Sequence, residues 1–354
     1  MIRSQKIILG FLIVLLLCAS VLASILVIVP PANQRVYELT QLQQLHLLGL
    51  TGEGITIGLI DTGVDYNHQE FSPSSFSGWN DVIHNQAQGY DDGDHGTHIA
   101  GLLVAQGTIE GSLSGIHLQG ITPQAQLLVV KAVSQADQEF GTGNDSLIAE
   151  AITYCIEHDA DIILLSLGNH PENILPVPAP QTQAACLTAI QNGICVIAPA
   201  GDDGDQDDED VAFPASIPKV LSVGAVNTFE AIASFSSQGH QYPDSEDPHK
   251  KPELVAPGVR LCSTRGQGSY GQISGTSQAA AMVTGCVALL LEAYPQLQTM
   301  KNETRVEIMT TVLIQTAKSY LPSSNQNELT HDDHYGYGLI QAYDAYVALA
   351  QYIE

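Results

Sequence analysis

The sequence is poor in positive charge. Its 354 residues include only 12 Lys and Arg against 38 Asp and Glu, which gives a formal net charge of −26 at pH 7. This balance argues against nucleic acid as a partner, because so acidic a chain repels phosphates. The charge fits an extracytoplasmic, salty or mildly acidic setting, or cationic substrates, and it equally fits a need for solubility alone.

Cysteine is also scarce and shows no metal-binding spacing. Of the six cysteines, Cys18 lies in an apolar N-terminal segment, and the other five include no CxxC pair and no zinc pattern. Export would permit disulfides, but the count outside the segment is odd and the spacing fixes no connectivity. We expect free, buried thiols at three positions that lie in apolar helix or strand patterns, namely Cys155, Cys195 and Cys286.

The N-terminus carries a long apolar run. After the basic start MIRSQK, residues 7–30 contain no charge and are long enough to cross a bilayer. The small residues at 21–23 fit the cleavage site of a signal peptide, whereas the apolar residues beyond them fit an uncleaved anchor. Arg3 and Lys6 keep the N-terminus inside, so both interpretations of residues 1–30 place the rest of the chain outside the cytoplasm.

Repeats and Pro/Gly linkers are missing from the remainder, so residues 31–354 are expected to form one domain. Five apolar runs look like buried strands, at residues 55–61, 126–133, 161–168, 194–200 and 219–226. Residues 145–160 place their apolar positions on one helical face, with Asp145 or Ser146 as the N-cap. Buried strands that alternate with helices predict an α/β fold with a mainly parallel central sheet and helices on both faces.

Three polar residues stand at the ends and starts of these elements. Asp61 ends the first predicted strand, His95 precedes a glycine and an apolar helix, and Ser277 begins another apolar helix. Active residues gather at the carboxyl ends of parallel strands, and an acid, an imidazole and a hydroxyl are the ingredients of a nucleophilic triad. Asp-Thr-Gly also occurs in aspartic proteases, but that mechanism needs two aspartates and the chain has one such motif.

The segments around these residues carry a family resemblance. GEGITIGLIDTGVDYNHQEF, HGTHIAGLL, ADIILLSLG and SGTSQAAAMVTG occur in an order that places Asp, His and Ser in succession. From about Arg35 to Ala348 the chain resembles the subtilisin-like serine peptidases. The resemblance implies a three-layer subtilisin-like fold and an endopeptidase that forms an acyl-enzyme on Ser277. Asp61 would orient the imidazole of His95, which would take the Ser277 proton and deliver it to the leaving amine.

The resemblance also bears on ligands and partners. It implies protein or peptide substrates that bind as an added strand along three residues, Ser166, Leu167 and Gly168. It implies no cofactor for catalysis. Structural calcium is left open, because Glu70 resembles a family calcium ligand but residues 107–120 do not match clearly. The short distance between the apolar segment and the family pattern leaves no room for the usual folding propeptide, so the chain folds unaided or with a folding or activating partner.

The stretch AGDDGDQDDED, residues 200–210, departs from the family. The family usually has Ala-Gly-Asn here, and the Asn side chain is one of two oxyanion donors, the other being the N–H of the nucleophile, here Ser277. Asp202 replaces that Asn. An ionised carboxylate that pointed at an oxyanion about 3 Å away would repel it by roughly 5 kcal/mol at an effective dielectric constant of about 20.

Three hypotheses account for Asp202. The neighbouring acids could keep it protonated, so that it donates a hydrogen bond and activity peaks below neutrality. Alternatively, the Asp202 side chain could point away from the oxyanion hole, so that a water molecule donates the hydrogen bond to the oxyanion. The chain could instead be a catalytically weak peptide-binding protein with a subtilisin-like fold. The acid-active sedolisins and one prohormone-convertase branch also carry Asp here, which argues against automatic inactivation.

The remaining signals leave alternatives open. The acidic run could be a weak calcium loop, an acidic rim that prefers Lys or Arg before the scissile bond, or a solvated loop. His331 and His334 could bind a metal or belong to a polar loop, and Asn144 and Asn302 begin glycosylation sequons. The family commonly has Met-Ala-Ser/Thr-Pro after the serine. This chain has Gln278 followed by three alanines, a change expected to shift helix packing without removing a catalytic group.

Overall fold

A computed structural model of the protein describes residues 33–107, 118–134, 144–167, 179–204, 211–239, 250–321 and 329–353. The predicted signal or anchor at 7–30, Gly168 and the acidic residues 205–210 lie outside the described residues. Buried apolar residues from Val36 to Leu349 form one contiguous core.

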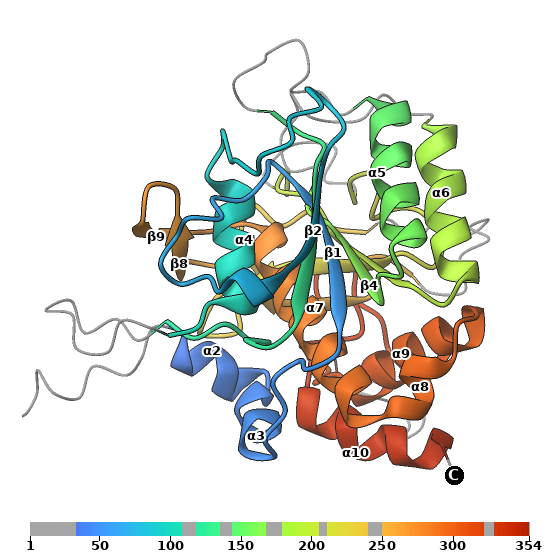
Figure 1. The fold of residues 1–354 in the computed structure, drawn as a ribbon. Helices are drawn as coiled ribbons and strands as arrows, with labels where there is room; N and C mark the ends of the chain where they lie inside the picture. The colour runs from blue at the N-terminus through green and yellow to red at the C-terminus, as the bar shows by residue number, and fades with distance from the viewer. Residues whose placement is uncertain are drawn as a thin grey trace, which may run out of the picture.

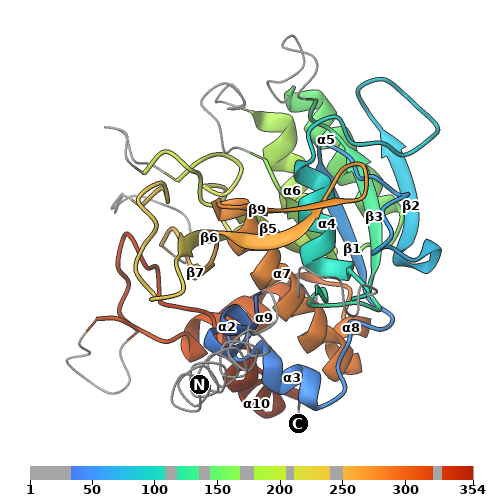
Figure 2. The same ribbon diagram turned by 90° about the vertical axis from the view of Figure 1, so that its left-hand side faces the viewer.

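A parallel sheet of seven strands lies at the centre of the fold (Figures 1 and 2). The strands are β1 (Thr56–Asp61), β2 (Phe76–Asp81), β3 (Gln126–Lys131), β4 (Ile162–Leu165), β5 (Cys195–Pro199), β6 (Leu221–Val226) and β7 (Leu254–Pro257), in the order β2-β3-β1-β4-β5-β6-β7. The five strands predicted from apolar runs are confirmed as β1, β3, β4, β5 and β6, each slightly shorter than its run. The edge strand β2 escaped prediction because its sequence FSGWND has no apolar run.

Helices cover both faces of the sheet, which confirms the three-layer α/β prediction. On one face lie α4 (His95–Val104) and α7 (Thr276–Ala293), and on the other lie α5 (Asp145–Glu157) and α6 (Pro180–Gln191) (Figure 1). Below them, near both described ends of the chain, are α2 (Gln34–Leu39), α3 (Leu42–Leu47), α8 (Pro295–Thr299), α9 (Glu303–Thr316) and α10 (Ala342–Ile353). A short 3-10 helix, η1 (Pro73–Ser75), precedes β2, and a hairpin of β8 (Leu261–Arg265) and β9 (Ser269–Ile273) packs beside α4.

The order of the strands reverses at the centre of the sheet. From β1 the chain crosses to the edge strand β2 and returns to β3, which lies between β2 and β1, whereas β4 to β7 follow one another on the opposite side of β1. Connections therefore leave the carboxyl ends of the neighbouring strands β1 and β4 in opposite directions, which opens a crevice between them. Asp61 is the last residue of β1, and Ser166 directly follows β4.

The predicted apolar face of α5 is confirmed, but its predicted N-cap is wrong. Asn144 caps the helix, since its side-chain oxygen accepts a hydrogen bond from the Ser146 N–H at 3.0 Å. The Asp145 carboxylate instead accepts hydrogen bonds from the Gln181 and Thr182 N–H groups at the start of α6. Asp145 therefore joins two helices rather than capping its own.

Helix α7 is the longest described helix and lies in the core. Of the described helices, it alone is long and apolar enough to cross a membrane, but 89% of that stretch is buried inside the protein. Its apolar character is explained by its contacts with β4 to β7 of the sheet and with the neighbouring helices α4, α8 and α10.

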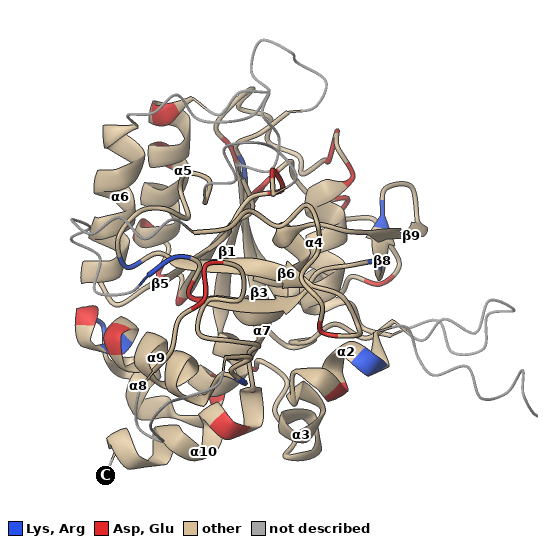
Figure 3. Cartoon of the chain, turned by 180° about the vertical axis from the view of Figure 1, so that it is seen from behind, with Lys and Arg blue, Asp and Glu red and all other residues tan. Residues whose placement is uncertain are grey.

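The described cysteines are all buried and unpaired, which confirms the expectation for Cys155, Cys195 and Cys286. Burial raises the pKa of the Cys186 thiol to about 12 and that of Cys195 to about 11. Charged residues, in contrast, lie mainly in loops and at helix ends, with acidic positions spread over the fold (Figure 3). Two cations, Lys131 at the end of β3 and Arg305 in α9, are fully buried.

Candidate active site

Asp61 and His95 form a hydrogen-bonded pair. The His95 Nδ1 atom lies 2.8 Å from Asp61 Oδ1 and 3.0 Å from Oδ2, and Asp61 is fully buried. A carboxylate only accepts hydrogen bonds, so Nδ1 carries the proton and Nε2 holds the lone pair of the neutral ring. The His95 side chain is 23% exposed. A basic nitrogen that a buried carboxylate orients from behind is suited to accept a proton.

Two glycines allow the segments that carry this pair to approach. Gly63 has a φ of +104°, and a Cβ there would lie 1.9 Å from the carbonyl oxygen of Tyr90. A Cβ on Gly96 would lie 2.0 Å from the carbonyl oxygen of Gly63. The glycines after Asp61-Thr62 and after His95 therefore close the turn of β1 onto the start of α4.

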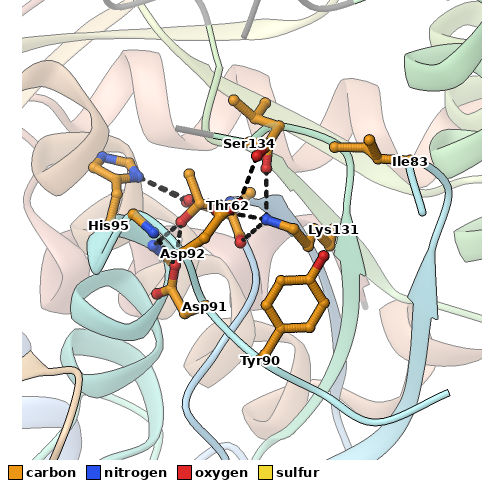
Figure 4. A network of polar contacts seen from close by, with 12 residues as sticks. Thr62, Ile83, Tyr90, Asp91, Asp92, His95, Lys131 and Ser134 are labelled. Carbon is orange, nitrogen blue, oxygen red and sulfur yellow. Dashed lines mark hydrogen bonds and ion pairs between the residues drawn. The ribbon is translucent and has the colours of Figure 1, made fainter. Parts of the chain in front are cut away.

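Thr62 connects Asp61 to the segment before α4. Its N–H donates to Asp61 Oδ1 at 2.6 Å, and its hydroxyl donates to Asp91 Oδ1 at 2.8 Å while accepting from the Gly96 N–H at 3.0 Å (Figure 4). The second oxygen of Asp91 accepts hydrogen bonds from the N–H and hydroxyl of Thr97. The carboxylate of Asp61 and the first turn of α4 are thus held by one network.

Lys131 connects this network to the end of β3. Its Nζ donates to the Thr62 carbonyl at 2.6 Å and to the Val133 carbonyl at 2.9 Å, and it pairs with Asp92 Oδ1 at 2.7 Å (Figure 4). It also lies 4.9 Å from the centre of the Tyr90 ring. One ammonium group therefore joins the carboxyl ends of β1 and β3 to the loop before α4.

Nearby carboxylates raise the pKa of His95. Burial lowers it, but the charge and hydrogen bond of Asp61, with the charges of Asp91 and Asp202, outweigh burial and bring the pKa above its ordinary value. His98, one turn further along α4, behaves oppositely, since burial and the charge on His95 lower its pKa to about 4. His98 therefore stays neutral where His95 titrates.

Asp202 contacts the start of α7, the helix that carries Ser277. Ser277 is the second residue of the helix and is fully buried. The N–H and hydroxyl of Thr276 both donate to Asp202 Oδ1 at 2.8 Å. Because the charge of Asp202 also acts on His95, the structure brings Asp202 to the same site as the Asp61–His95 pair.

Ser166 continues β4 beside the end of β1. Its N–H donates to the Ile60 carbonyl at 3.1 Å, and Ser166 and Leu167 are both buried. The described part of the segment predicted to bind the substrate, Ser166 and Leu167, therefore begins at the crevice between β1 and β4. Gly168 falls outside the described residues.

Within the described ranges, the structure shows no set of ligands for the metal sites considered from the sequence. No group of three or more His, Cys, Asp or Glu is placed to hold a metal there. Glu70 is buried and accepts a hydrogen bond from the Tyr270 hydroxyl at 2.9 Å. His331 contacts the Pro252 carbonyl through Nε2 at 2.9 Å, and His334 lies beside Asp332.

Four residues of the network were not among the site residues predicted from the sequence, namely Thr62, Asp91, Asp92 and Lys131. A local signal existed for Lys131, which is the one charge in the apolar run QLLVVKAV. A cation in a buried strand needs a counter-charge, so it predicts that an acid lies close in space. The run itself does not reveal which acid that is.

Comparison with known proteins identifies the family to which the chain belongs. The sequence model of the subtilase family (peptidase S8) matches residues 52–338. The chain is 32% identical over 247 residues to the major intracellular serine protease of Bacillus subtilis (strain 168), covering 68% of this chain and 70% of that protein. It is 32% identical over 271 residues to subtilisin E of the same strain, covering 76% of this chain and 64% of that protein.

A third relative covers more of both chains. Subtilisin DY of Bacillus licheniformis is 29% identical over 293 residues, which make up 82% of this chain and 90% of that protein. The family match covers well over half of the chain and includes Asp61, His95 and Ser277. The chain therefore belongs to the subtilase family of serine-type endopeptidases.

Proposed function

We propose that the chain is an extracytoplasmic endopeptidase in which Asp61, His95 and Ser277 form the catalytic triad. The observation that carries this proposal is the pair of hydrogen bonds between His95 Nδ1 and the buried Asp61 carboxylate, in a chain whose family match includes all three residues. This pair fixes the tautomer that a general base needs.

The reaction follows from these positions. His95 Nε2 accepts the Ser277 hydroxyl proton as the oxygen attacks the peptide carbonyl, and the protonated imidazole delivers that proton to the leaving amine. The acyl-enzyme on Ser277 is then hydrolysed by the same steps with water as the nucleophile. Asp61 stabilises the imidazolium and remains ionised. The oxyanion forms between the Ser277 N–H, at the start of α7, and residue 202.

Substrate binding uses the edge that follows β4. A peptide in extended conformation would pair with the backbone of Ser166, Leu167 and Gly168 and so add a strand. The buried position of Ser166 and Leu167 beside the end of β1 supports this placement, because it brings a bound peptide next to Asp61 and its network.

Asp202 favours a second candidate, a weakly catalytic peptide-binding protein. Its Oδ1 atom accepts two hydrogen bonds from Thr276, and hydrogen bonds to a carboxylate stabilise its charged form. A negative charge there opposes an oxyanion. The raised pKa of His95 also works against an acidic optimum, because the imidazole must lose its proton to act as base. We therefore place the acid limb of activity above the ordinary histidine pKa.

Two sequence features support the location. The charge-free residues 7–30 follow a basic start, and the net charge of −26 fits an exported protein. Whether residues 1–30 are cleaved does not alter the side on which the site would lie.

Fluorophosphonate labelling of Ser277 between pH 4 and 9 tests the proposal, with Ser277→Ala as control. We expect labelling that rises with pH through the raised pKa of His95 and is absent from the control. A membrane-impermeant probe should label Ser277 on intact cells. Folded protein that is not labelled at any pH would refute the enzyme and favour the peptide-binding candidate, whereas labelling only after cell lysis would refute the location.

A further inference from the structure

Gln278, directly after Ser277, has a buried amide group that no described residue satisfies. The residue is 1% exposed, and neither Nε2 nor Oε1 makes a hydrogen bond within the described part of the chain. Burial of an amide without hydrogen bonds costs roughly 1–3 kcal/mol judged from mutational data. Such a group in a folded protein calls for an explanation, and a role in catalysis is one that would offset its cost.

The amide lies beside Asp202. A Cβ built on Gly275 would lie 2.7 Å from Gln278 Oε1 and 3.0 Å from Asp202 Oδ2, and these are the nearest atoms around that point. Thr276 binds the other carboxylate oxygen, Oδ1. The amide of Gln278 and Asp202 Oδ2 therefore flank the same side of Gly275, immediately before the helix start that carries Ser277.

The orientation of the amide decides what it can do. Oε1 and Asp202 Oδ2 both lie on the side of Gly275 where a Cβ would stand, and two acceptor oxygens cannot hydrogen-bond to each other. The two ends of an amide have nearly the same shape, so a half-turn about the last side-chain bond exchanges Oε1 for Nε2 without further movement. Nε2 then lies on the same side of Gly275 as Asp202, the residue that stands where the family usually has its oxyanion-donor Asn.

We propose that the side-chain amide of Gln278 is the second hydrogen-bond donor of the oxyanion hole, in place of residue 202. This inference rests on the proposed endopeptidase activity. In the resting site the Nε2–H donates to Asp202 Oδ2. When the substrate carbonyl becomes an oxyanion, Nε2–H donates to it together with the Ser277 N–H and separates it from the carboxylate. A donor that is already in place in a dry site stabilises the developing charge most.

A double-mutant cycle tests the donor. Gln278→Met removes the amide and keeps an unbranched side chain, so kcat should fall about 10²- to 10³-fold with little change in KM. Asp202→Asn alone should change kcat by less than about tenfold, since a donor is present. In the Gln278→Met background, Asp202→Asn should restore kcat about 100-fold, because the amide introduced at position 202 would supply the missing donor.

Controls separate catalysis from packing. Gln341→Met removes another buried amide, whose Nε2 donates to the Leu39 and Ile340 carbonyls, and it should leave kcat unchanged. If Gln278→Met fails to fold, Gln278→Leu also removes both N–H donors without adding a second carboxyl group beside Asp202, and it should show the same loss of kcat.

Two outcomes would overturn the inference. One is a Gln278→Met enzyme that keeps its kcat, and the other is an Asp202→Asn effect of equal size in both backgrounds. In either case the parent still hydrolyses peptides, so only the role of Gln278 fails. A parent that neither hydrolyses peptides nor reacts with fluorophosphonate would instead refute the proposed function.

Discussion

Two buried cations hold opposite ends of the central sheet. At the carboxyl ends, Lys131 joins the segments after β1 and β3 to Asp92 in the loop before α4. At the amino ends, Arg305 of α9 contacts the Asp161 carboxylate at 3.3 Å and its carbonyl at 3.1 Å, and it also bonds to the Gly193 and Gln298 carbonyls. Each cation gathers several carbonyl oxygens and one carboxylate in a fully buried position.

The two networks differ in the residues that lie on the segments they connect. The Lys131 network includes Thr62, whose N–H holds the Asp61 carboxylate against His95. The Arg305 network fixes the starts of β4 and β5, where none of the proposed catalytic residues lies. Active residues lie at the carboxyl ends of parallel strands. We therefore infer that the buried cation at the carboxyl ends, Lys131, positions a catalytic group, whereas the buried cation at the amino ends, Arg305, stabilises the fold.

Replacing Lys131 should have the largest effect. Lys131→Met leaves Asp92 without its cation, so we expect a loss of about 3–5 kcal/mol in the free energy of unfolding. Displacement of Thr62 and Asp61 should also lower kcat by about 100-fold in the folded enzyme. Urea unfolding and active-site-titrated kinetics measure the two effects. A variant with normal kcat would show that Lys131 is only structural and would erase the contrast with Arg305.

Replacing Arg305 should affect stability alone. We expect Arg305→Met to lower the free energy of unfolding by about 3 kcal/mol, since Lys301 still pairs with Asp161 at 2.8 Å. kcat per folded molecule should stay within about twofold of the parent, because the substituted side chain lies at the far end of the sheet. A fall in kcat comparable to that of Lys131→Met would contradict the division of roles.

Replacing Asp91 should produce the smallest effect, on the pH dependence of both activity and stability. Asp91→Asn removes one of the negative charges that raise the pKa of His95, so the acid limb of kcat/KM should move to lower pH. These charges stabilise the folded protein when His95 is protonated. The stabilisation is complete below the ordinary pKa of histidine and is lost as the pH rises through the raised pKa of His95 in the folded protein. The variant should therefore also be less stable than the parent at low pH. An acid limb that stays in place would assign the raised pKa to Asp61 and Asp202 alone.

Local sequence was enough to predict one part of the site. Asp61, His95 and Ser277 were predicted because each stands at a strand end or helix start, and in the structure His95 is hydrogen-bonded to Asp61 while Ser277 is the second residue of α7. The partnership of Lys131 with Asp92 was out of reach, because the two residues are 39 positions apart and meet only through the register of β1 and β3.

Sequence also misjudged side chains whose importance depends on their neighbours. Asn144 rather than Asp145 caps α5, although both residues favour that position. Gln278 looked like a packing change, since a sequence shows an amide but not whether the fold gives it a partner. Such details depend on where distant segments come to rest.

The buried thiols can report when each part of the protein opens, because a thiol reacts only once it is exposed to solvent. Each of five separate elements carries one cysteine that is buried in the native state, namely α5 (Cys155), α6 (Cys186), β5 (Cys195), β8 (Cys262) and α7 (Cys286). Alkylation followed by peptide mass analysis therefore times the opening of each element in the unmodified chain. The order in which the thiols become reactive would show whether the helix that carries Ser277 opens alone or only with the whole sheet.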